Sequence, residues 1–373
     1  MKLQRTNRLR SLAAGAVAVS GALVLTACGT DNQSGQQGQN AQPVGDIACE
    51  GKGNLLASGS SAQANAMDVW IKNYQSACAE TKVNYKPTGS GAGIQEFLQG
   101  TTAFAGSDSA LEPEEIKQSQ KICKGGQAID LPMVGGPIAV GYNLPGVENL
   151  VLDAETIAKI FDSKISQWDD PAIKKLNPDA DLPSTKIQAF HRSDDSGTTD
   201  NFTKYLNTAA PDAWTYEPAK QWTAKGGQSA DGSSGIATNV KQNEGAIGYF
   251  ELSYATGNEI PAVALDTGAG EPVQATTANA SKAIAEAEIV GQGKDLALEL
   301  DYTTKAEGAY PLVLVTYEIA CDKGNDKATL AATKSFLNYM ASGDGQKAIT
   351  DIDYAPMPEE IITKVRETVD GLS

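Results

Sequence analysis

The sequence predicts an α/β protein in which helices pack on sheets, and three observations support this prediction. Short apolar runs alternate through most of the chain with segments whose apolar residues recur at helical spacing. The 373 residues are enough for two domains with buried cores. The composition, 41% hydrophobic and 20% charged, is that of a folded globular chain and excludes a disordered or multi-span membrane protein.

The expected elements follow one another from residue 54 onward. Apolar runs predict strands at 54–57, 82–86, 103–106, 137–143, 186–192 and 311–320. Apolar residues three and four apart predict helices within 66–78, 94–98, 153–161, 202–206 and 330–340. Asp153 stands where the N-cap of the third helix is expected. No internal repeat of fixed period occurs, so the sequence does not predict a repeat protein.

Charge and histidine content exclude several function classes. The chain has 30 Lys and Arg against 46 Asp and Glu, and the net charge of −16 repels nucleic acid and anionic lipid. The one histidine, His191, excludes an imidazole metal cluster and is the single candidate base for a Ser/His/Asp triad. In an alternating strand, His191 points away from the face of Arg192, so we expect it to be structural. We expect no metal ion, no cofactor and no nucleic-acid partner.

Residues 1–27 have the features of an export signal. A basic N-terminus precedes a run of small and apolar residues that ends at Ala27. The tetrad Leu25-Thr26-Ala27-Cys28 resembles the cleavage box of bacterial lipoproteins, in which the cysteine becomes the new N-terminus and carries acyl chains such as palmitate. We therefore expect lipid attachment at Cys28, on the outer face of the bacterial cytoplasmic membrane. Plain secretion with removal of Cys28 is the alternative.

Residues 28–46 are expected to form a flexible tether. Beyond Cys28 they are mostly Gly, Gln, Asn, Ser and Asp, a composition that cannot bury enough apolar surface to fold. A segment of this length has a root-mean-square reach on the order of 25 Å, enough to hold a globular body over a membrane. The folded body is expected to start near Ile47.

Four cysteines remain once Cys28 is set aside, and an even number in an exported protein favours two disulfides. Three pairings can be drawn. Cys49 precedes the first strand and Cys78 ends the helix that returns antiparallel to it, which places both at one end of a strand-helix unit. We favour Cys49 with Cys78 and, by elimination, Cys123 with Cys321.

Three loops place glycine and hydroxyl residues between a strand and a helix start. They are Gly59-Ser60-Ser61-Ala62, Gly89-Ser90-Gly91-Ala92-Gly93 and Ser193-Asp194-Asp195-Ser196-Gly197-Thr198. Free backbone N–H groups and the positive end of the helix dipole suit a small anion at such positions. For any one loop, Ser and Gly can serve only as caps and turn residues. Three such loops together favour one anion at the point where the helices converge.

Nucleotide-binding fingerprints are absent from these loops. No Gly-x-x-x-x-Gly-Lys-Ser/Thr occurs, and Ile94 stands where a dinucleotide-binding loop needs its last glycine. The sequence therefore disfavours a P-loop or Rossmann enzyme.

Two charged residues accompany the loops. Arg192 ends the strand before the third loop, where a guanidinium can grip an oxyanion with two parallel hydrogen bonds, although it could also be a solvated surface arginine. Asp108 ends a run at a comparable strand end. A carboxylate beside an anion fits only a ligand that carries a proton for it to accept. The alternative for Asp108 is a helix cap for the segment near Glu112.

Several phrases of the chain resemble the phosphate-binding protein of bacterial high-affinity phosphate ABC transporters. They are the three loops above together with Phe104-Ala105-Gly106-Ser107-Asp108, Ile165-Ser166-Gln167-Trp168-Asp169-Asp170 and Gly245-Ala246-Ile247-Gly248-Tyr249. The resemblance runs in the family's order from about Asn54 to the C-terminal region. It implies a two-lobed periplasmic-binding fold with a cleft between the lobes. Lobe 1 is expected at 47–135 and 311–373, and lobe 2 at 136–310.

Carried over residue by residue, the resemblance implies a phosphate site with donors from all three loops. The implied ligand residues are Ser61, Ala62, Ser90, Asp108, Arg192, Ser196, Gly197 and Thr198. Asp108 corresponds to the family's carboxylate acceptor, and Asp194 to an aspartate that holds the arginine. The chain departs from the family pattern at Ser61-Ala62, where Thr-Phe is common, so Ala62 is expected to supply only its amide. It also has Gly91 where a second serine is frequent.

The resemblance implies a receptor that closes two lobes on inorganic phosphate and delivers it to the membrane permease subunits of an ABC transporter. We expect a monomer that performs no chemistry on its ligand. The alternatives are a receptor for another tetrahedral oxyanion such as sulfate or molybdate, a secreted phosphatase on the same fold, and a surface adhesin with a vestigial pocket. Asp108 argues against sulfate and molybdate, and a single histidine argues against a phosphatase that needs a metal cluster or an activated nucleophile.

Overall fold

The computed structural model describes residues 47–373, so the expected export signal 1–27, the expected lipid-attachment residue Cys28 and the expected tether 28–46 lie outside the described residues. The strands are β1 (Gly53–Gly59), β2 (Thr81–Lys86), β3 (Phe104–Ser107), β4 (Ala128–Tyr142), β5 (Val151–Asp153), β6 (Gln188–Arg192), β7 (Gln228–Ala230), β8 (Ala246–Glu251), β9 (Ala264–Asp266), β10 (Glu288–Ile289), β11 (Leu298–Glu299) and β12 (Val313–Cys321). The helices are α1 (Ala64–Ala77), α2 (Ser90–Leu98), α3 (Pro113–Ser119), α4 (Ala154–Phe161), α5 (Pro171–Leu176), α6 (Gly197–Ala209), α7 (Gly232–Gln242), α8 (Leu252–Gly257), α9 (Thr277–Ile284), α10 (Leu330–Met340), α11 (Gly343–Thr350) and α12 (Glu359–Asp370).

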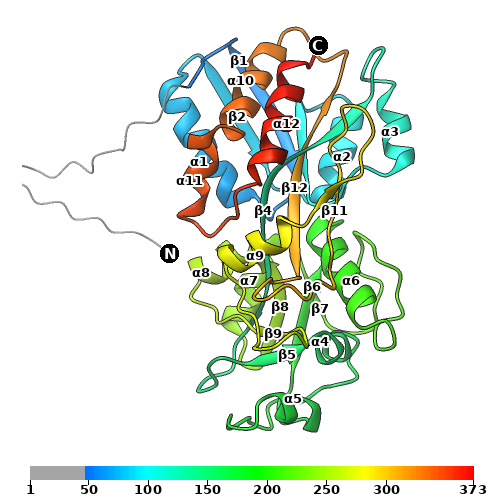
Figure 1. Ribbon diagram of the computed structural model, residues 1–373, viewed down its shortest axis with the longest axis vertical. Coiled ribbons are helices and arrows are strands. Elements are labelled where there is room, and N and C mark those ends of the chain that lie inside the picture. Colours follow the sequence, from blue (N-terminus) through cyan, green and yellow to red (C-terminus); the bar gives the residue numbers. More distant parts are fainter. Residues whose placement is uncertain (1–46) are drawn as a thin grey trace, which may run out of the picture. The chain divides into compact units, whose positions relative to one another are not determined.

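Eight strands form one mixed sheet in the order β2-β1-β3-β12-β4-β8-β6-β7. The strands β1, β2 and β3 are parallel to one another, as are β6, β7 and β8. Between these two parallel groups, β12 and β4 run antiparallel to their neighbours. In Figure 1 the two groups lie at opposite ends of β4 and β12, each covered by its own helices. The two-lobed α/β fold expected for the chain is confirmed.

The strand β4 links the two groups. It pairs with β12 up to Pro137 and with β8 from Ile138 onward. All 15 of its residues are buried, and at about 3.3 Å per residue it spans about 50 Å. The change of partner at Pro137 and Ile138 lies close to the expected lobe boundary at residue 136, and the exact division into lobes stays a prediction.

The start of β4 differs from the sequence expectation. The expected strand began at residue 137, but β4 already begins at Ala128. A buried aspartate, Asp130, and a proline, Pro132, interrupt the apolar pattern that would have indicated a strand. Pro132 is accommodated because the register shifts opposite it, between Thr316 and Tyr317 of β12, and proline is tolerated at a bulge.

Two helices begin earlier than their apolar spacing indicated. The expected helices 94–98 and 202–206 start at Ser90 and Gly197. The spacing marks only the residues that face the core, and the first turns of both helices are built from small residues. As a result, each helix begins within the loop that the sequence singled out.

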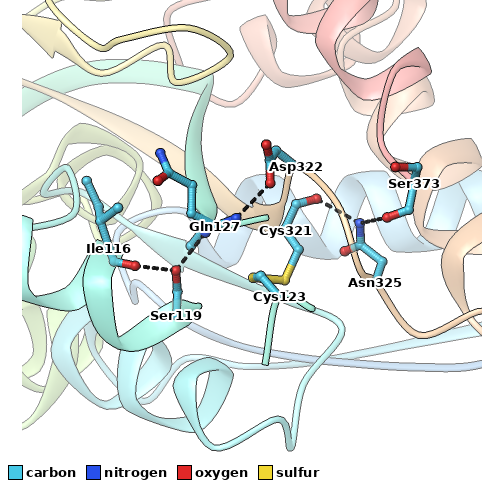
Figure 2. The surroundings of a disulfide bond; sticks show 9 residues. Ile116, Ser119, Cys123, Gln127, Cys321, Asp322, Asn325 and Ser373 are labelled. Atoms are coloured by element: carbon cyan, nitrogen blue, oxygen red, sulfur yellow. Dashed lines mark hydrogen bonds between the residues drawn. A yellow bond between two sulfur atoms is a disulfide. The ribbon is translucent and has the colours of Figure 1, made fainter. Parts of the chain in front are cut away.

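Both expected disulfides are confirmed. Cys49 pairs with Cys78, and Cys123 with Cys321. The second bridge joins the segment after α3 to the end of β12 (Figure 2). Beside it, the Asn325 side chain donates to the carbonyl oxygens of Cys321 and Ser373 at 2.7 and 3.2 Å, which holds the C-terminal residue in place.

Candidate functional site

Four helix N-termini converge where the two strand groups meet. They belong to α1, α2 and α6, which follow the three loops of the sequence analysis, and to α7. Ser61 before α1 and Ser233 in α7 join two of them, because Ser61 Oγ accepts from Ser233 N at 3.0 Å and lies 3.1 Å from Ser233 Oγ. Ser90 joins the others, since its Oγ accepts from the N–H groups of Gly197 and Asp108 at 3.1 and 3.2 Å. The arrangement concentrates N–H and O–H groups at one point.

Asp108 lies inside this cluster, directly after β3, and is 3% exposed. Its Oδ1 accepts from Ser60 Oγ at 2.5 Å and from Thr316 Oγ1 at 2.8 Å. Its Oδ2 accepts from Thr198 Oγ1 at 3.2 Å. Burial raises the pKa of Asp108, while these hydroxyls and the charge of Arg192 oppose the rise. Asp108 does not cap α3, because Glu112 occupies the N-cap and forms a capping box with Glu115.

Arg192 ends β6 and is 2% exposed. Its Nε donates to Asp194 Oδ1 at 2.7 Å and its Nη2 donates to Asp194 Oδ2, so the two side chains form a bidentate ion pair. Burial acts to raise the pKa of Asp194, but the hydrogen bonds and charge of Arg192 outweigh it and hold that pKa below its usual value. The Nη1 group of Arg192 lies 3.4 Å from Ser233 Oγ. Asp194 thus fixes one edge of the guanidinium, and the Nη1 group at the other edge faces the N-terminus of α7.

Glycine is required where the second loop passes the ion pair. Gly89 has φ +91, and a Cβ built there would lie 2.5 Å from Asp194 Oδ2. A side chain at this position would therefore be strained and would displace the carboxylate that holds Arg192.

The N-terminus of α6 is held in place from the core. Its N-cap, Ser196, accepts from Thr199 N at 3.2 Å. Thr199 Oγ1 lies 2.7 Å from the hydroxyl of Tyr249, and Phe202 stacks on the Tyr249 ring with centroids 4.2 Å apart. The Tyr249 hydroxyl also accepts from Arg192 N at 3.2 Å. One buried tyrosine therefore aligns the helix start with the arginine.

The expected site residues lie together, and two of them have protein partners that the sequence did not indicate. The Ala62 amide donates to Ser60 Oγ at 3.0 Å, and the Gly197 amide donates to Ser90 Oγ. The backbone on both sides of the α1 start is also fixed, because the carbonyl oxygens of Ser61 and Ala62 accept from the hydroxyls of Tyr254 and Tyr354. The assignment of these residues to a ligand stays a prediction.

The sequence did not indicate three residues of this cluster, Gly232, Ser233 and Thr316, and it indicated Ser60 only as a member of the first loop. A signal existed for the two in α7, because Asp231-Gly232-Ser233-Ser234-Gly235 repeats the glycine and serine composition of the other loops before a helix. Gly232 N donates to Asp194 Oδ1 at 3.1 Å. No local signal marks Thr316, which lies mid-strand in β12 and reaches Asp108 only through the tertiary fold.

His191 does not take part in the cluster through its ring. The ring stacks on Trp222 with centroids 4.7 Å apart, and its Nδ1 lies 3.0 Å from the carbonyl oxygen of Arg192. Burial lowers the pKa of His191. Within residues 47–373, no group of three or more His, Cys, Asp and Glu side chains is arranged to hold a metal ion.

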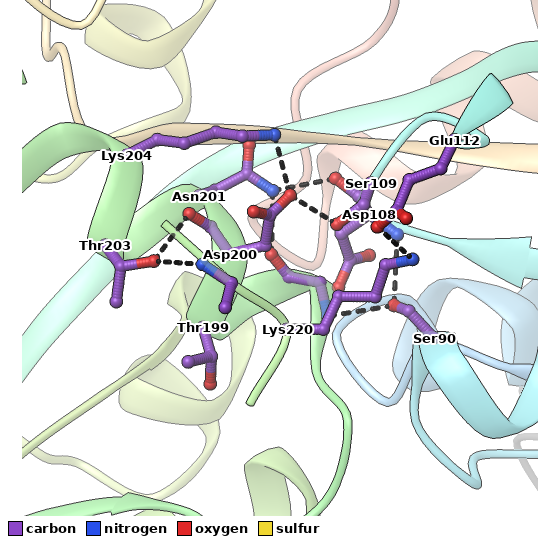
Figure 3. Close-up of polar contacts among 12 residues, drawn as sticks. Ser90, Asp108, Ser109, Glu112, Thr199, Asp200, Asn201, Thr203, Lys204 and Lys220 are labelled. Atoms are coloured by element: carbon purple, nitrogen blue, oxygen red, sulfur yellow. Dashed lines mark hydrogen bonds and ion pairs between the residues drawn. The ribbon is translucent and has the colours of Figure 1, made fainter. Parts of the chain in front are cut away.

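Polar contacts also cross between the strand groups beside Asp108 (Figure 3). Ser109 Oγ donates to Asp200 Oδ2 at 2.6 Å, and Asn201 Nδ2 donates to the Asp108 carbonyl oxygen at 2.7 Å. Lys220 pairs with Glu115 at 3.0 Å. A groove of 1060 Å³ opens next to these contacts and is lined by residues of the Asp108 loop, α6 and the segment 286–306.

Comparisons with known proteins agree with this architecture. A family model described as PBP superfamily domain matches residues 33–344. The phosphate-binding protein PstS 3 of Mycobacterium tuberculosis is 42% identical over 377 residues and the match covers 100% of both chains. The phosphate-binding protein PstS 2 of the same organism is 41% identical, covering 98% of this chain and 99% of the relative.

Solved structures with low sequence identity share the fold. A high-affinity periplasmic phosphate-binding protein solved with phosphate superposes with a TM-score of 0.69 at 21% identity, covering 84% of this chain and 93% of its own. A phosphate-binding protein from Stenotrophomonas maltophilia gives a TM-score of 0.63 at 18% identity with the same coverage. The family model and the two Mycobacterium tuberculosis relatives show that the chain belongs to the PstS family of phosphate-binding proteins, within the PBP superfamily.

Proposed function

We propose that this protein is an extracytoplasmic receptor that captures inorganic phosphate between its two lobes and delivers it to the permease of an ABC transporter. The observation that carries the proposal is a buried carboxylate, Asp108, set among hydroxyl and amide donors at the convergence of four helix N-termini. A single carboxylate in a ring of donors matches a ligand that is mostly an acceptor but carries one proton.

Phosphate has this chemistry near neutral pH. Near neutral pH inorganic phosphate is present as HPO₄²⁻ and H₂PO₄⁻, and both forms keep a proton that can be donated in a hydrogen bond to Asp108. Sulfate lacks that proton, so one of its oxygens would face the lone pairs of the carboxylate. The remaining phosphate oxygens would accept from Arg192 and from the donors at Ser61, Ser90 and Thr198.

The proposal extends to Ala62, Ser196 and Gly197 through their backbone and hydroxyl donors, with Asp194 holding the arginine in place. The starts of α1, α2 and α6 bring the positive ends of three helix dipoles to the site. The Ala62 and Gly197 amides there donate to the hydroxyl oxygens of Ser60 and Ser90 in this structure. In this account the protein binds phosphate without chemical change and acts as a monomer.

Isothermal titration with phosphate tests the receptor function. We expect one phosphate per chain and no hydrolysis of p-nitrophenyl phosphate by the same preparation. Absence of binding would contradict the receptor proposal, and turnover of the ester would favour the phosphatase alternative.

The proposed location rests on the export signal and on lipid attachment at Cys28. Acyl chains on Cys28 would hold the body at the outer face of the cytoplasmic membrane, where it can meet permease subunits. No helix within residues 47–373 is long and apolar enough to cross a membrane. Cys28→Ser should release the protein or leave an uncleaved precursor. Mass spectrometry that finds an unmodified N-terminus on the native protein would contradict the anchor.

A further inference from the structure

The two oxygens of the Asp108 carboxylate have different surroundings. Oδ1 receives two hydroxyl donors, Ser60 from the β1–α1 loop and Thr316 from β12, at 2.5 and 2.8 Å. Oδ2 receives one longer bond, from Thr198 in α6 at 3.2 Å. Ser60 and Thr316 are 0% and 1% exposed, so water does not compete for either donor. Oδ1 is therefore saturated by the protein, and Oδ2 keeps capacity to accept.

Both hydroxyls are fixed by backbone contacts of their own. Ser60 N donates to the carbonyl oxygen of Gly106 at 2.8 Å, and Ser60 Oγ accepts from Ala62 N at 3.0 Å. Because the oxygen of Ser60 receives an amide, its single proton is directed to Asp108. Thr316 sits in the register of β12 with β4 opposite Val134, and its branched side chain has few rotamers.

We infer that Ser60 and Thr316 are positioning residues that determine the preference for phosphate over sulfate. They occupy Asp108 Oδ1, hold the carboxylate plane, and keep Oδ2 as the acceptor for the proton of the ligand. The inference rests on the proposed phosphate-receptor function and deepens it.

The charge state of Asp108 depends on these hydroxyls. Burial raises the pKa of Asp108, and the bonds from Ser60 and Thr316 are the strongest opposing influences, ahead of the Arg192 charge and the Thr198 bond. Hydrogen bonds to the charged form favour that form, so their loss should raise the pKa further. A protonated Asp108 would donate rather than accept and could then bind a sulfate oxygen.

Other ionisable groups around Asp108 do not take over this role. They are Arg192 of β6, Glu318 of β12, Tyr85 of β2 and Tyr254 of α8. Burial raises the pKa of both tyrosines above their usual values, so they are neutral at pH 7. Burial also raises the pKa of Glu318 well above its usual range, which favours its protonated form. Arg192 supplies the remaining charge, and the variants below leave it unchanged.

The test uses two variants that remove a hydroxyl, Thr316→Val and Ser60→Ala. Two separate variants, Thr316→Ser and Ser60→Thr, change the same residues but keep the hydroxyl. Phosphate and sulfate are titrated into each full-length protein between pH 5.5 and 8.5. We expect the ratio of phosphate to sulfate affinity to fall on the order of tenfold or more in the variants that lack a hydroxyl. The preference for phosphate should also be lost at a higher pH in these variants than in the native protein, because their Asp108 is protonated at a higher pH. The hydroxyl-bearing variants should recover most of the ratio.

A matched control is Thr333→Val, which makes the same change at a buried threonine of α10 outside the cluster. It should leave the ratio unchanged. Carbon-13 NMR of the Asp108 carboxyl without ligand gives an independent readout, because its titration midpoint should move up in Thr316→Val.

The outcomes separate this inference from the proposed function. If the native protein binds phosphate but the hydroxyl-free variants keep its phosphate-to-sulfate affinity ratio and its Asp108 titration midpoint, only the positioning role is overturned. A native protein that binds no phosphate would overturn the proposed function and the inference with it.

Discussion

Asp108 and Glu318 are two buried carboxyl groups on neighbouring strands with opposite surroundings. Asp108 follows β3 and is 3% exposed, and Glu318 lies in β12 and is 0% exposed. Three hydroxyls donate to Asp108. Within residues 47–373, neither Glu318 oxygen has a hydrogen-bond partner of good geometry, and only the Gln63 side chain lies close enough to favour its charged form.

Burial changes the pKa of an acid by an amount that depends on the donors around it. Burial without donors raises the pKa of Glu318 well above its usual range and favours its protonated form. Burial with donors leaves Asp108 with a pKa raised by far less, so that it can still serve as an acceptor. A binding site for a protonated anion needs the second arrangement, and the fold places it where the helix N-termini meet.

The largest expected effect comes from removing the cation that faces Asp108. Arg192→Ala should weaken phosphate binding by roughly 2–5 kcal/mol, because it removes one partner of a buried charge pair and leaves Asp194 without its cationic partner. Arg192→Lys should also lose affinity, since a single ammonium cannot keep the bidentate pair with Asp194 while serving the ligand. Titration calorimetry measures both, and near-native curves would exclude Arg192 from the site.

Glu251 provides an intermediate case between the two carboxyls. Its Oε2 accepts from the N–H and hydroxyl groups of Ser253, while Oε1 has no partner among the described residues. Burial raises the pKa of Glu251 to about 8. Between the unfolded value near 4.5 and about 8 the native state holds a proton that the unfolded state has lost, so this group makes stability fall as pH rises through that window.

Glu251→Gln should remove that part of the pH dependence. We expect the free energy of unfolding of the variant, relative to that of the native protein, to be higher at pH 8 than at pH 5. The difference should be a few kcal/mol at most. Urea denaturation at the two pH values measures the difference. Equal slopes of stability against pH in both proteins would show that Glu251 is ionised in the folded state.

Asp108→Asn should have a smaller effect on phosphate affinity. The amide keeps an acceptor oxygen, so we expect a loss of roughly 0.5–1.5 kcal/mol, the usual contribution of one hydrogen bond. The ratio of phosphate to sulfate affinity should fall, because the amide can also donate a hydrogen bond to a sulfate oxygen. A variant that loses all phosphate binding would show that the negative charge itself is required.

Glu318→Gln is the smallest expected effect and completes the comparison. Burial favours the protonated form of Glu318 in the folded protein. An amide of the same shape should therefore leave phosphate affinity unchanged in the same calorimetric titration. A marked change would show that Glu318 carries a charge felt at Asp108.

Local sequence patterns predicted those parts of the site that depend on one segment of chain. Gly89, Ser90, Asp108 and Arg192 stand at strand ends or helix starts, and their residue types suit those positions. The disulfides were also predictable. Cys49 before the first strand and Cys78 at the end of the following helix lie at the same end of one strand-helix unit, which leaves Cys123 to pair with Cys321.

The parts that depend on distant segments could not be predicted in the same way. Thr316 and Ser233 are 208 and 172 residues from the residues they contact, Asp108 and Ser61. A buried threonine in a strand has the same local pattern as any β-branched core residue. The first half of β4 was missed for a related reason, since the tertiary partners of Asp130 are what allow an aspartate inside a strand.

Competition between oxyanions on the native protein shows whether Asp108 accepts the proton of the ligand. Phosphate bound at pH 7 is challenged with arsenate and with sulfate at equal concentration. We expect that arsenate, which also carries a proton, displaces phosphate and that sulfate does not. Displacement of phosphate by sulfate at similar concentration would contradict the role of Asp108 as a charged acceptor for the proton of the ligand.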